Sequence, residues 1–385
     1  MLDQTPAPRG RELLAATGLA AFCSARWPEI EWKVQPYGAE GANLVATCGP
    51  GPLLYSHLDT SLDGDGRAAP EVTGREDAPG PLVVTDGVAE GFCLGVARAP
   101  VAAAVAAFAN ARQGTLLIAG SGTHRRGGHG EGVRAYLASA PSLPPAAIVA
   151  KGGPPALITE EPGAAFLKVR ITGRPGVAML PATAVPVGGI VRHAGLVLDA
   201  VETWRERYLA SRAPFGRVGA QAGVGAIRAG WTEKPDLLPA ELLLDLYVIT
   251  VPGERGSRLA TELTATLHAV LAGGPLEGCS AHVEVEWLHD AQVTEERAPI
   301  VKAAEHAWAH VFDEAPLDIV GWTGSTDGVV LREYGIDTVR VGPQSERSAV
   351  DPRRDVVDLA VLARYQRLYE LLLSGDDLHE HVHDH

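Results

Sequence analysis

The stretch LLYSHLDT, Leu53 to Thr60, is where the interpretation of this chain begins. It opens as an apolar run and ends on His57 and Asp59, which are two residues apart. Side chains alternate between the two faces of a strand, so a strand ending here places both residues on one face. Histidine and carboxylate are common ligands of zinc. The stretch therefore predicts half of a metal site, and the rest of the chain would have to supply the other half.

Length and composition limit the class of protein. The 385 residues suit two domains, and 46% hydrophobic with 21% charged residues is the composition of an ordinary globular enzyme. The formal net charge of -14 argues against a nucleic-acid partner, which would favour a basic surface. We therefore expect a small-molecule substrate, and neither a nucleic acid nor a membrane as partner.

The location predicted from the sequence is the cytoplasm. The N-terminal segment carries an acidic residue at Asp3 and only a short apolar stretch, which is unlike a signal peptide. No apolar run reaches the ~18 residues that cross a bilayer. The cysteines at positions 23, 48, 93 and 279 have no CxxC spacing, which is typical of reduced structural thiols.

Strands and helices alternate in the first part of the chain. Strands are expected around Leu53, at Gly114–Gly120 and at Pro145–Lys151, with an Ala-rich helix at Ala99–Arg112. The Gly-, Asp- and Pro-rich stretch Asp63–Gly80 is expected to be a surface loop. This order predicts an α/β domain with a mostly parallel sheet and helices on both faces.

A different order of elements lies between about Ala164 and His289. It reads strand, helix, strand, strand, helix, strand, which is the βαββαβ order of a ferredoxin-like unit. The sequence therefore predicts an inserted domain. The expected boundaries are 1–163 and 290–374 for the discontinuous α/β domain, 164–289 for the inserted lid and 375–385 for a polar, His-rich tail.

This order of parts resembles the di-zinc amidohydrolases that include aminoacylases, glutamate carboxypeptidases, dipeptidases and succinyl-diaminopimelate desuccinylases. The resemblance covers nearly the whole chain. It is carried by SHLDT (56–60), VRITGRPGVAMLP (169–181) and GSTDG (324–328) with GIDTVRVGP after it. It implies an α/β catalytic domain with an inserted lid, and two zinc ions held by two histidines and three carboxylates. It also implies a glutamate as general base and a homodimer formed through the lid.

His57 and Asp59 match the family's first histidine and the aspartate after it, but the other ligand positions differ. The turn that carries the family's bridging aspartate has Arg98 and no carboxylate. Arg125 and Arg126 stand where the family has paired glutamates. Where the next acidic ligand should follow a strand, the only ionisable residue is Lys151.

The remaining family positions also differ. The final ligand histidine should follow GSTDG, yet no histidine occurs between His310 and His379. In the lid, the positions where the family has a histidine, an asparagine and an arginine are occupied here by Val177, Asp236 and Ile249.

Four of the expected carboxylate positions thus carry cations, which changes the predicted chemistry. Like charges about 4 Å apart in a partly buried site repel by several kcal/mol, so we predict no di-zinc centre and no cofactor. In one interpretation Asp59 pairs with an arginine and His57 is a hydrogen-bonded relic. In another the arginines bind a substrate carboxylate or phosphate and His57 serves as acid or base. A single-metal site is a third possibility.

The segment THRRGGHGEG, Thr123 to Gly132, leaves further alternatives open. His124, His129 and Glu131 are either replacement ligands, a new acid–base set or part of a flexible, Gly-rich surface loop. A fourth alternative is that the Gly-rich loop and its two arginines cradle a phosphate through backbone N–H groups. Asp327 in GSTDG is expected beside the cleft, where it would support loops around the substrate.

Two other groups of residues are expected to have no catalytic role. Glu160 and Glu161 lie at the entry to the lid and are expected to form a solvated turn. The alternating tail histidines are expected to bind Ni²⁺ or Zn²⁺ adventitiously. They are His379, His381, His383 and His385.

Three functions fit these residues. The first is a metal-independent enzyme that carries out hydrolysis, acyl transfer or cyclisation on a small amide- or carboxylate-bearing metabolite. The second is a non-catalytic binder of a ligand or partner, and the third is a metal-dependent peptidase or deacylase with atypical ligands. For the first we predict catalytic roles for His57, Asp59 and His124. The predicted substrate-binding residues are Arg98, Arg125, Arg126, Lys151 and Asp327.

Overall fold

The structure is a computed structural model that describes residues 1–2, 7–8, 10–60, 80–177, 189–212 and 214–375. The chain divides into two compact units. The first unit comprises Met1–Thr159, Val293–Ile319 and Thr326–His385, and the second comprises Glu160–Gln292 and Val320–Ser325. The second unit thus begins four residues before the expected boundary at Ala164 and also takes in a short segment just before Thr326.

The first unit is built on a six-stranded sheet with the order β18-β9-β4-β8-β3-β2. Neighbours among β18, β9, β4 and β8 run parallel, and β3 and β2 are antiparallel additions. All five residues of β4 are buried, as expected for a parallel strand covered on both faces. The strands are β2 (Lys33–Tyr37), β3 (Gly41–Cys48), β4 (Leu53–His57), β8 (Gly114–Ala119), β9 (Ala147–Val149) and β18 (Thr338–Arg340).

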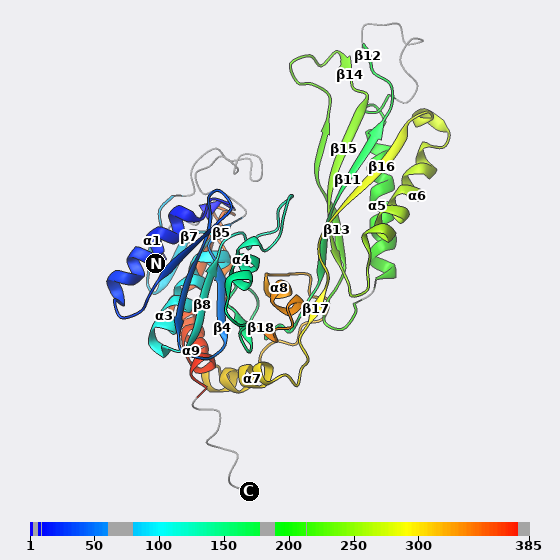
Figure 1. Cartoon of the computed structure of the whole chain (residues 1–385). Helices are drawn as coiled ribbons and strands as arrows, with labels where there is room; N and C mark the ends of the chain where they lie inside the picture. Colours follow the sequence, from blue (N-terminus) through cyan, green and yellow to red (C-terminus); the bar gives the residue numbers. More distant parts are fainter. Residues whose placement is uncertain (3–6, 9, 61–79, 178–188, 213, 376–385) are drawn as a thin grey trace. The chain divides into compact units, whose positions relative to one another are not determined.

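Helices cover both faces of this sheet, which confirms the α/β class (Figure 1). One face packs against α1 (Leu13–Arg26), α3 (Ala99–Ala111), α7 (Pro299–Val311) and α9 (Leu359–Ser374). The other packs against α4 (Glu131–Ser139) and α8 (Gly328–Glu333). The helix α9 begins where the Asp358 side chain accepts hydrogen bonds from two backbone N–H groups and ends at Gly375 with positive φ.

A second, four-stranded sheet of the first unit packs against α9. Its order is β19-β20-β7-β6. Between β7 and α3 runs a five-residue π-helix, η1, which begins after Cys93 in a left-handed conformation. The remaining elements are β1 (Ala7–Pro8), β5 (Asp59–Thr60), β6 (Val83–Thr85), β7 (Val88–Phe92), η1 (Leu94–Arg98), β19 (Glu346–Arg347) and β20 (Arg354–Asp358).

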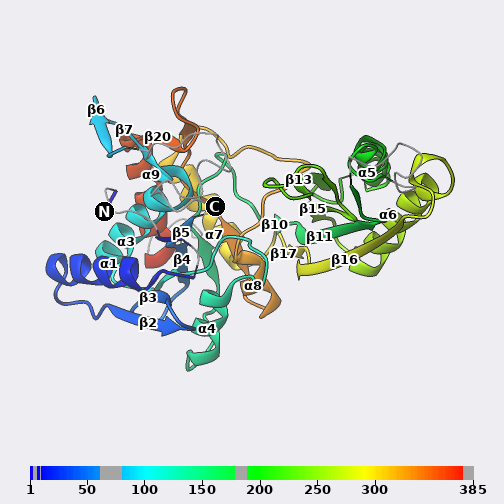
Figure 2. The ribbon, with the colours of Figure 1, turned by 90° about the horizontal axis from the view of Figure 1, so that it is seen from above.

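The second unit is a four-stranded antiparallel sheet with the order β13-β15-β11-β16. In chain order this is the arrangement of a ferredoxin-like βαββαβ unit. Two helices pack on one face of the sheet (Figure 2). The elements are β11 (Gly163–Thr172), α5 (Ala194–Ser211), β13 (Gln221–Ala229), β15 (Glu241–Thr250), α6 (Gly256–Leu271) and β16 (Ser280–His289), with β10 (Glu160–Glu161), β12 (Gly176–Val177), β14 (Leu237–Leu238), η3 (Gly274–Leu276) and β17 (Gln292–Val293).

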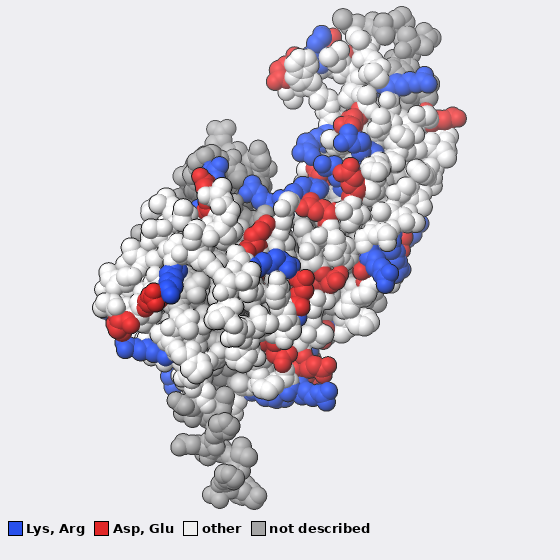
Figure 3. Space-filling model, viewed as in Figure 1, with Lys and Arg blue, Asp and Glu red and all other residues white. Residues whose placement is uncertain are grey.

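The other face of this sheet carries charges of both signs. Asp245 lies opposite Lys168 in the register of β15 and β11, and Arg228 donates to Asp245 at 2.6 Å. Lys168 in turn lies opposite Glu284 of β16. Cross-strand pairs of opposite charge stabilise a sheet. Figure 3 shows acidic and basic side chains interspersed on the visible face, rather than a field of one sign.

The entry to the second unit differs from the expected solvated turn. Glu161 is fully buried, and the Glu160 carboxylate accepts a hydrogen bond from the Arg217 backbone at 2.8 Å. Glu160 is therefore bonded within the second unit, and Glu161 is buried rather than solvated. The predicted lid positions Val177 and Ile249 lie on β12 and β15.

Among the residues that the structure describes, one helical stretch has the length and apolar composition to span a membrane. It runs from Leu94 to Ala111, but 78% of it is buried inside the structure, as in a core helix. Two expected segments lie outside the described residues. They are the loop 63–79 and the tail 376–385 with its histidines.

Candidate active site in the first unit

The candidate site lies where three parallel strands end together. His57 ends β4, and its register partner Ala119 ends the neighbouring β8. On the other side of β4, β9 ends at Val149, two residues before Lys151. Ligands of open α/β sheets bind beyond the carboxyl ends of the strands. The loops that carry Asp59, His124 and Lys151 all begin at this edge.

Asp59 holds the loop that follows β8. Its carboxylate accepts hydrogen bonds from Gly122 N at 2.6 Å, Thr123 N at 3.0 Å and Thr123 Oγ1 at 2.6 Å. Burial raises the pKa of this carboxyl, but His57 and these donors outweigh it and lower the pKa to about 2. Asp59 is therefore an ionised group near neutral pH, with both oxygens engaged.

His57 is completely buried beside Asp59. Its Nδ1 lies 3.4 Å from Asp59 Oδ1, and neither ring nitrogen makes a hydrogen bond of normal geometry within the described chain. Burial lowers the pKa of His57, and the positive charge of Lys151 lowers it further. Asp59 offsets these effects only in part. The imidazole is therefore neutral and available as a proton acceptor near neutral pH.

Asp327 is the second carboxyl of this edge and its environment is the opposite of that of Asp59. It is fully buried, and Tyr55 Oη donates to its Oδ2 at 2.7 Å. Burial raises the pKa of Asp327 to about 7, although the Tyr55 hydrogen bond and the Lys151 charge act the other way. Oδ1 has no hydrogen-bond partner among residues that the structure describes. Asp327 thus retains its proton at pH values well above those at which an aspartic acid side chain usually ionises.

Tyr55 was not among the predicted site residues. The sequence did carry a signal for it, because Tyr55 lies two positions before His57 in the same strand and therefore on the same face. What the sequence did not show is that the partner of its hydroxyl would be Asp327, 272 residues further along the chain.

Lys151 connects this cluster to a pocket in the first unit. Its charge acts on both His57 and Asp327, and the residue also lines a pocket of about 690 Å³. The close packing around its backbone requires glycine at position 342, where a Cβ atom would lie 1.8 Å from Lys151 O. The pocket is lined by Gly95, Val96, Lys151, Gly152, Gln344 and Ser345, among others.

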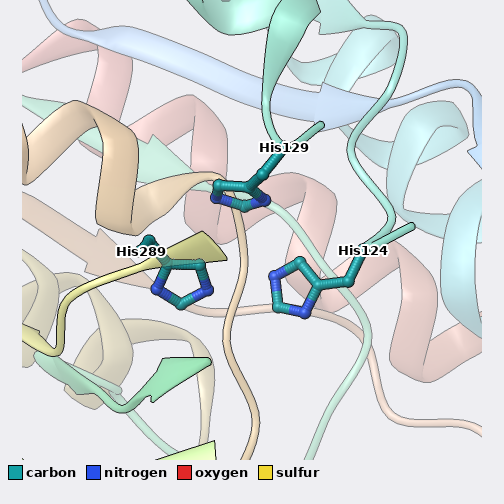
Figure 4. Close-up of side chains that lie close together, drawn as sticks. All are labelled: His124, His129 and His289. Atoms are coloured by element: carbon teal, nitrogen blue, oxygen red, sulfur yellow. The ribbon is translucent and has the colours of Figure 1, made fainter. Parts of the chain in front are cut away.

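The loop with the two arginines and two histidines follows Thr123. Arg125 and Gly128 form a bridge, so Arg125 and Arg126 stand exposed at a tight turn. Behind it the rings of His124 and His129 lie together, with centroids 4.8 Å apart (Figure 4). His129 is buried and His124 is half-buried. The loop therefore has two parts: an exposed turn that carries the two arginines, and a pair of histidines packed behind it.

Arg98 occupies a different place from the other predicted cations. It ends η1, is buried, and donates from Nη1 to Phe92 O at 2.9 Å. A guanidinium used by the backbone is not presented to a substrate. We therefore leave Arg98 out of the proposed substrate-binding group.

Glu12 is a buried residue of this edge that the sequence gave no reason to select. Its Oε1 accepts hydrogen bonds from Gly10 N at 2.7 Å and Ser121 N at 2.9 Å. Ser121 has a positive φ of 57°, which turns the loop so that successive N–H groups reach Glu12 and then Asp59. Glu12 and Asp59 together hold the segment that leads to His124.

The donors around His57 do not fit the two-zinc centre that the fold family implies. Both oxygens of Asp59 are already used by the loop after β8, and Lys151 adds a positive charge. In the part of the chain that the structure describes, His57 and Asp59 have no third potential ligand, whether histidine, cysteine or carboxylate, at a distance that would allow all three to bind one ion. We therefore assign no role to a metal bound at His57.

The fold and site define a two-unit α/β protein with an inserted ferredoxin-like unit, and solved structures that share this fold include peptidases and an amidase. An M20 family metallo-carboxypeptidase from Sulfolobus solfataricus superimposes with a TM-score of 0.68 at 13% identity, covering 96% of both chains. Aminopeptidase PepT from Bacillus cereus gives 0.64 at 15% identity, over 97% of this chain and 95% of that one. Human carnosine dipeptidase 1 gives 0.63 at 14%, over 94% and 91%.

These likenesses confirm the expected resemblance at the level of the fold. The chain has the fold of the M20 metallopeptidases, including the inserted unit. No protein-family profile and no curated protein matches the sequence. The similarity thus lies in the architecture, while the residues at the carboxyl edge of the sheet are those described above.

Proposed function

We propose that this chain is a divergent enzyme of the metallopeptidase fold that works without a metal on a small anionic metabolite bearing an amide or carboxylate. The observation that carries the proposal is the buried His57–Asp59 pair beside Lys151, at the carboxyl edge of the parallel sheet. A cytoplasmic location remains part of the proposal.

The residues divide the proton transfers between them. Ionised Asp59 orients His57 and stabilises its imidazolium, and neutral His57 accepts a proton. Asp327 carries a proton up to a pH of about 7 and serves as the donor. Neighbouring titratable groups with pKa values shifted apart are a means by which one site supplies both an acid and a base.

Cations take over the recognition of the substrate. Lys151 lines the pocket of about 690 Å³ and binds an anionic group there, while Arg125 and Arg126 extend the positive charge on the neighbouring loop. Because no metal activates water here, the substrate must be reactive or the nucleophile internal. Hydrolysis of an activated amide, acyl transfer and ring closure all meet that condition.

The test separates binding from turnover. We expect His57→Ala to lower kcat by about 10²–10⁴-fold on a panel of N-acyl amino acids and cyclic amides, because proton transfer contributes that much. Ligand binding by calorimetry should change little in this variant. Lys151→Met should instead weaken binding by at least tenfold. His268→Ala, an exposed histidine of α6, is the matched control that should alter neither.

A non-catalytic binder is the alternative, and the same panel distinguishes it. A ligand that stabilises the wild-type chain without any turnover would refute the enzyme and leave a binding protein. Turnover unaffected by His57→Ala would refute the assigned proton acceptor.

One observation favours a metal-dependent peptidase or deacylase as a second candidate. The ring nitrogens of His124 and His129 lie within 4.8 Å of each other, a separation that one ion can bridge. This candidate predicts bound zinc that His129→Ala removes, and activity abolished by a chelator. The measurement needs a chain in which the tail histidines are replaced, since we expect them to bind metal adventitiously.

A further inference from the structure

Two histidines lie one turn apart on α7, away from the residues used above. His306 and His310 have the i, i+4 spacing that places side chains on one face of a helix. Their ring centroids are 4.4 Å apart, with the ring planes inclined at 49°. The same spacing holds zinc in helical metal sites, where both imidazoles reach one ion.

The helix presents this pair outward. Ala304, Ala307 and Trp308 of α7 are buried in the core of the first unit, whereas His306 is half-buried and His310 is exposed. His310 Nδ1 lies 2.9 Å from His306 O, so this hydrogen bond fixes the ring and leaves Nε2 for a ligand. In the described structure neither histidine has a carboxylate at ion-pair distance, which would compete for the imidazole.

The two arginines near this pair repel a metal ion only weakly, because acidic side chains offset their positive charges. His310 lines a groove with Arg364 and Arg367 of α9. Arg364 pairs with Asp313 at 3.5 Å, and Arg367 pairs with Glu370 at 3.3 Å. Both guanidinium charges are therefore balanced locally.

We propose that His306 and His310 form a bidentate site for a divalent transition-metal ion. Imidazole nitrogen suits Cu²⁺, Ni²⁺ and Zn²⁺, and affinity for such donors rises from Ni²⁺ to Cu²⁺. Only the folded helix brings the two rings together, so the ion stabilises the folded first unit. This site is independent of the proposed function, because neither histidine touches the residues assigned to it.

The experiment uses the full chain with His379, His381, His383 and His385 replaced by Asn, titrated with CuCl₂ and NiCl₂ in a calorimeter and in urea unfolding. A hundredfold excess of ion over its Kd should lower the unfolding equilibrium constant about 100-fold. His306→Ala and His310→Ala should each weaken the binding at least tenfold. His268→Ala, without a second histidine one turn away, should retain it.

Other histidines require one more variant. A His129→Ala chain should retain the α7 signal, so that loss in His129→Ala with retention in His306→Ala would overturn the proposal. Equal affinity and stoichiometry in wild-type and doubly substituted His306→Ala/His310→Ala chains would overturn it too. These outcomes do not depend on turnover, so failure of this proposal can be distinguished from failure of the proposed function.

Discussion

Two aspartates of the same edge show how residue chemistry is set by immediate surroundings. Asp59 receives three hydrogen bonds and has its pKa lowered to about 2. Asp327 receives one hydrogen bond, and burial raises its pKa to about 7. Donors stabilise the ionised form, whereas burial without enough donors stabilises the protonated form.

Asp327 therefore links stability to pH. The unfolded carboxyl ionises near pH 4, but the folded one keeps its proton until about pH 7. Between these values the folded state binds more protons, so the free energy of unfolding falls as pH rises, by about 1.4 kcal/mol per pH unit. Asp327→Asn lacks this dependence. Its free energy of unfolding relative to that of the wild type should therefore rise between pH 4.5 and 7.5, by on the order of a few kcal/mol.

Urea unfolding across that pH range measures the difference. The exposed Asp199→Asn of α5 is the control, and its difference from wild type should stay flat with pH. A flat difference for Asp327→Asn as well would mean that Asp327 is ionised in the folded chain, which would remove the proposed proton donor.

The sequence predicted the site residues unevenly, for a physical reason. His57 and Asp59 were predicted from the two-residue repeat of one strand, although the structure ends β4 at His57 and places Asp59 in β5. Lys151 and Asp327 were predicted from the order of motifs. The roles of Glu12 and Tyr55 rest on contacts with residues 109 and 272 positions away. Such contacts exist only once the sheet has formed, so no local pattern announces them.

At the scale of elements, the loop after β8 joins the fold to the site. Gly120 and Gly122 of this loop leave no room for a larger side chain. A Cβ at Gly122 would lie 2.7 Å from His57 Cβ and 2.9 Å from Tyr55 Oη, and one at Gly120 would lie 2.4 Å from Tyr37 Oη. The loop is thus pressed against the side chains it positions.

Gly122→Ala should accordingly destabilise the chain and displace His57. We expect a loss of about 1–3 kcal/mol in urea unfolding, the usual effect of overpacking. Gly18→Ala is the matched control, because Gly18 lies inside α1 with nothing within 4 Å of its Cβ position. That change should stabilise by about 0.5–1 kcal/mol. Equal stability of Gly122→Ala and wild type would show that the loop is not packed as described.

Elements with a strong repeat were predicted well, and irregular ones were not. The Ala-rich helix expected at Ala99–Arg112 is α3, and the strand expected at Gly114–Gly120 is β8. The π-helix η1 before α3 was missed. Arg98 N bonds to Cys93 O, five residues back, and this wider turn has no hydrophobic period of its own. Such turns often occur near functional sites.

At the scale of the molecule, the two units have separate hydrophobic cores. The core of the second unit is made by the sheet with α5 and α6, and that of the first by the parallel sheet with its covering helices. Each unit therefore has an independent source of stability. Changes at the carboxyl edge of the first sheet therefore need not disturb the core of the second unit.

Strand β13 is the part of the second unit that we expect to mediate assembly. It is an edge strand, and Val224 and Ile227 are 37% and 53% exposed along it. An unpaired apolar edge favours pairing with a second copy. We expect wild-type chain at tens of micromolar to sediment as a homodimer and Ile227→Lys to sediment as a monomer, because a charge on the edge blocks pairing. Leu14→Lys, at a residue of α1 that is 85% exposed, should leave the dimer intact. A monomeric wild type, or a dimer unaffected by Ile227→Lys, would exclude this edge as the interface.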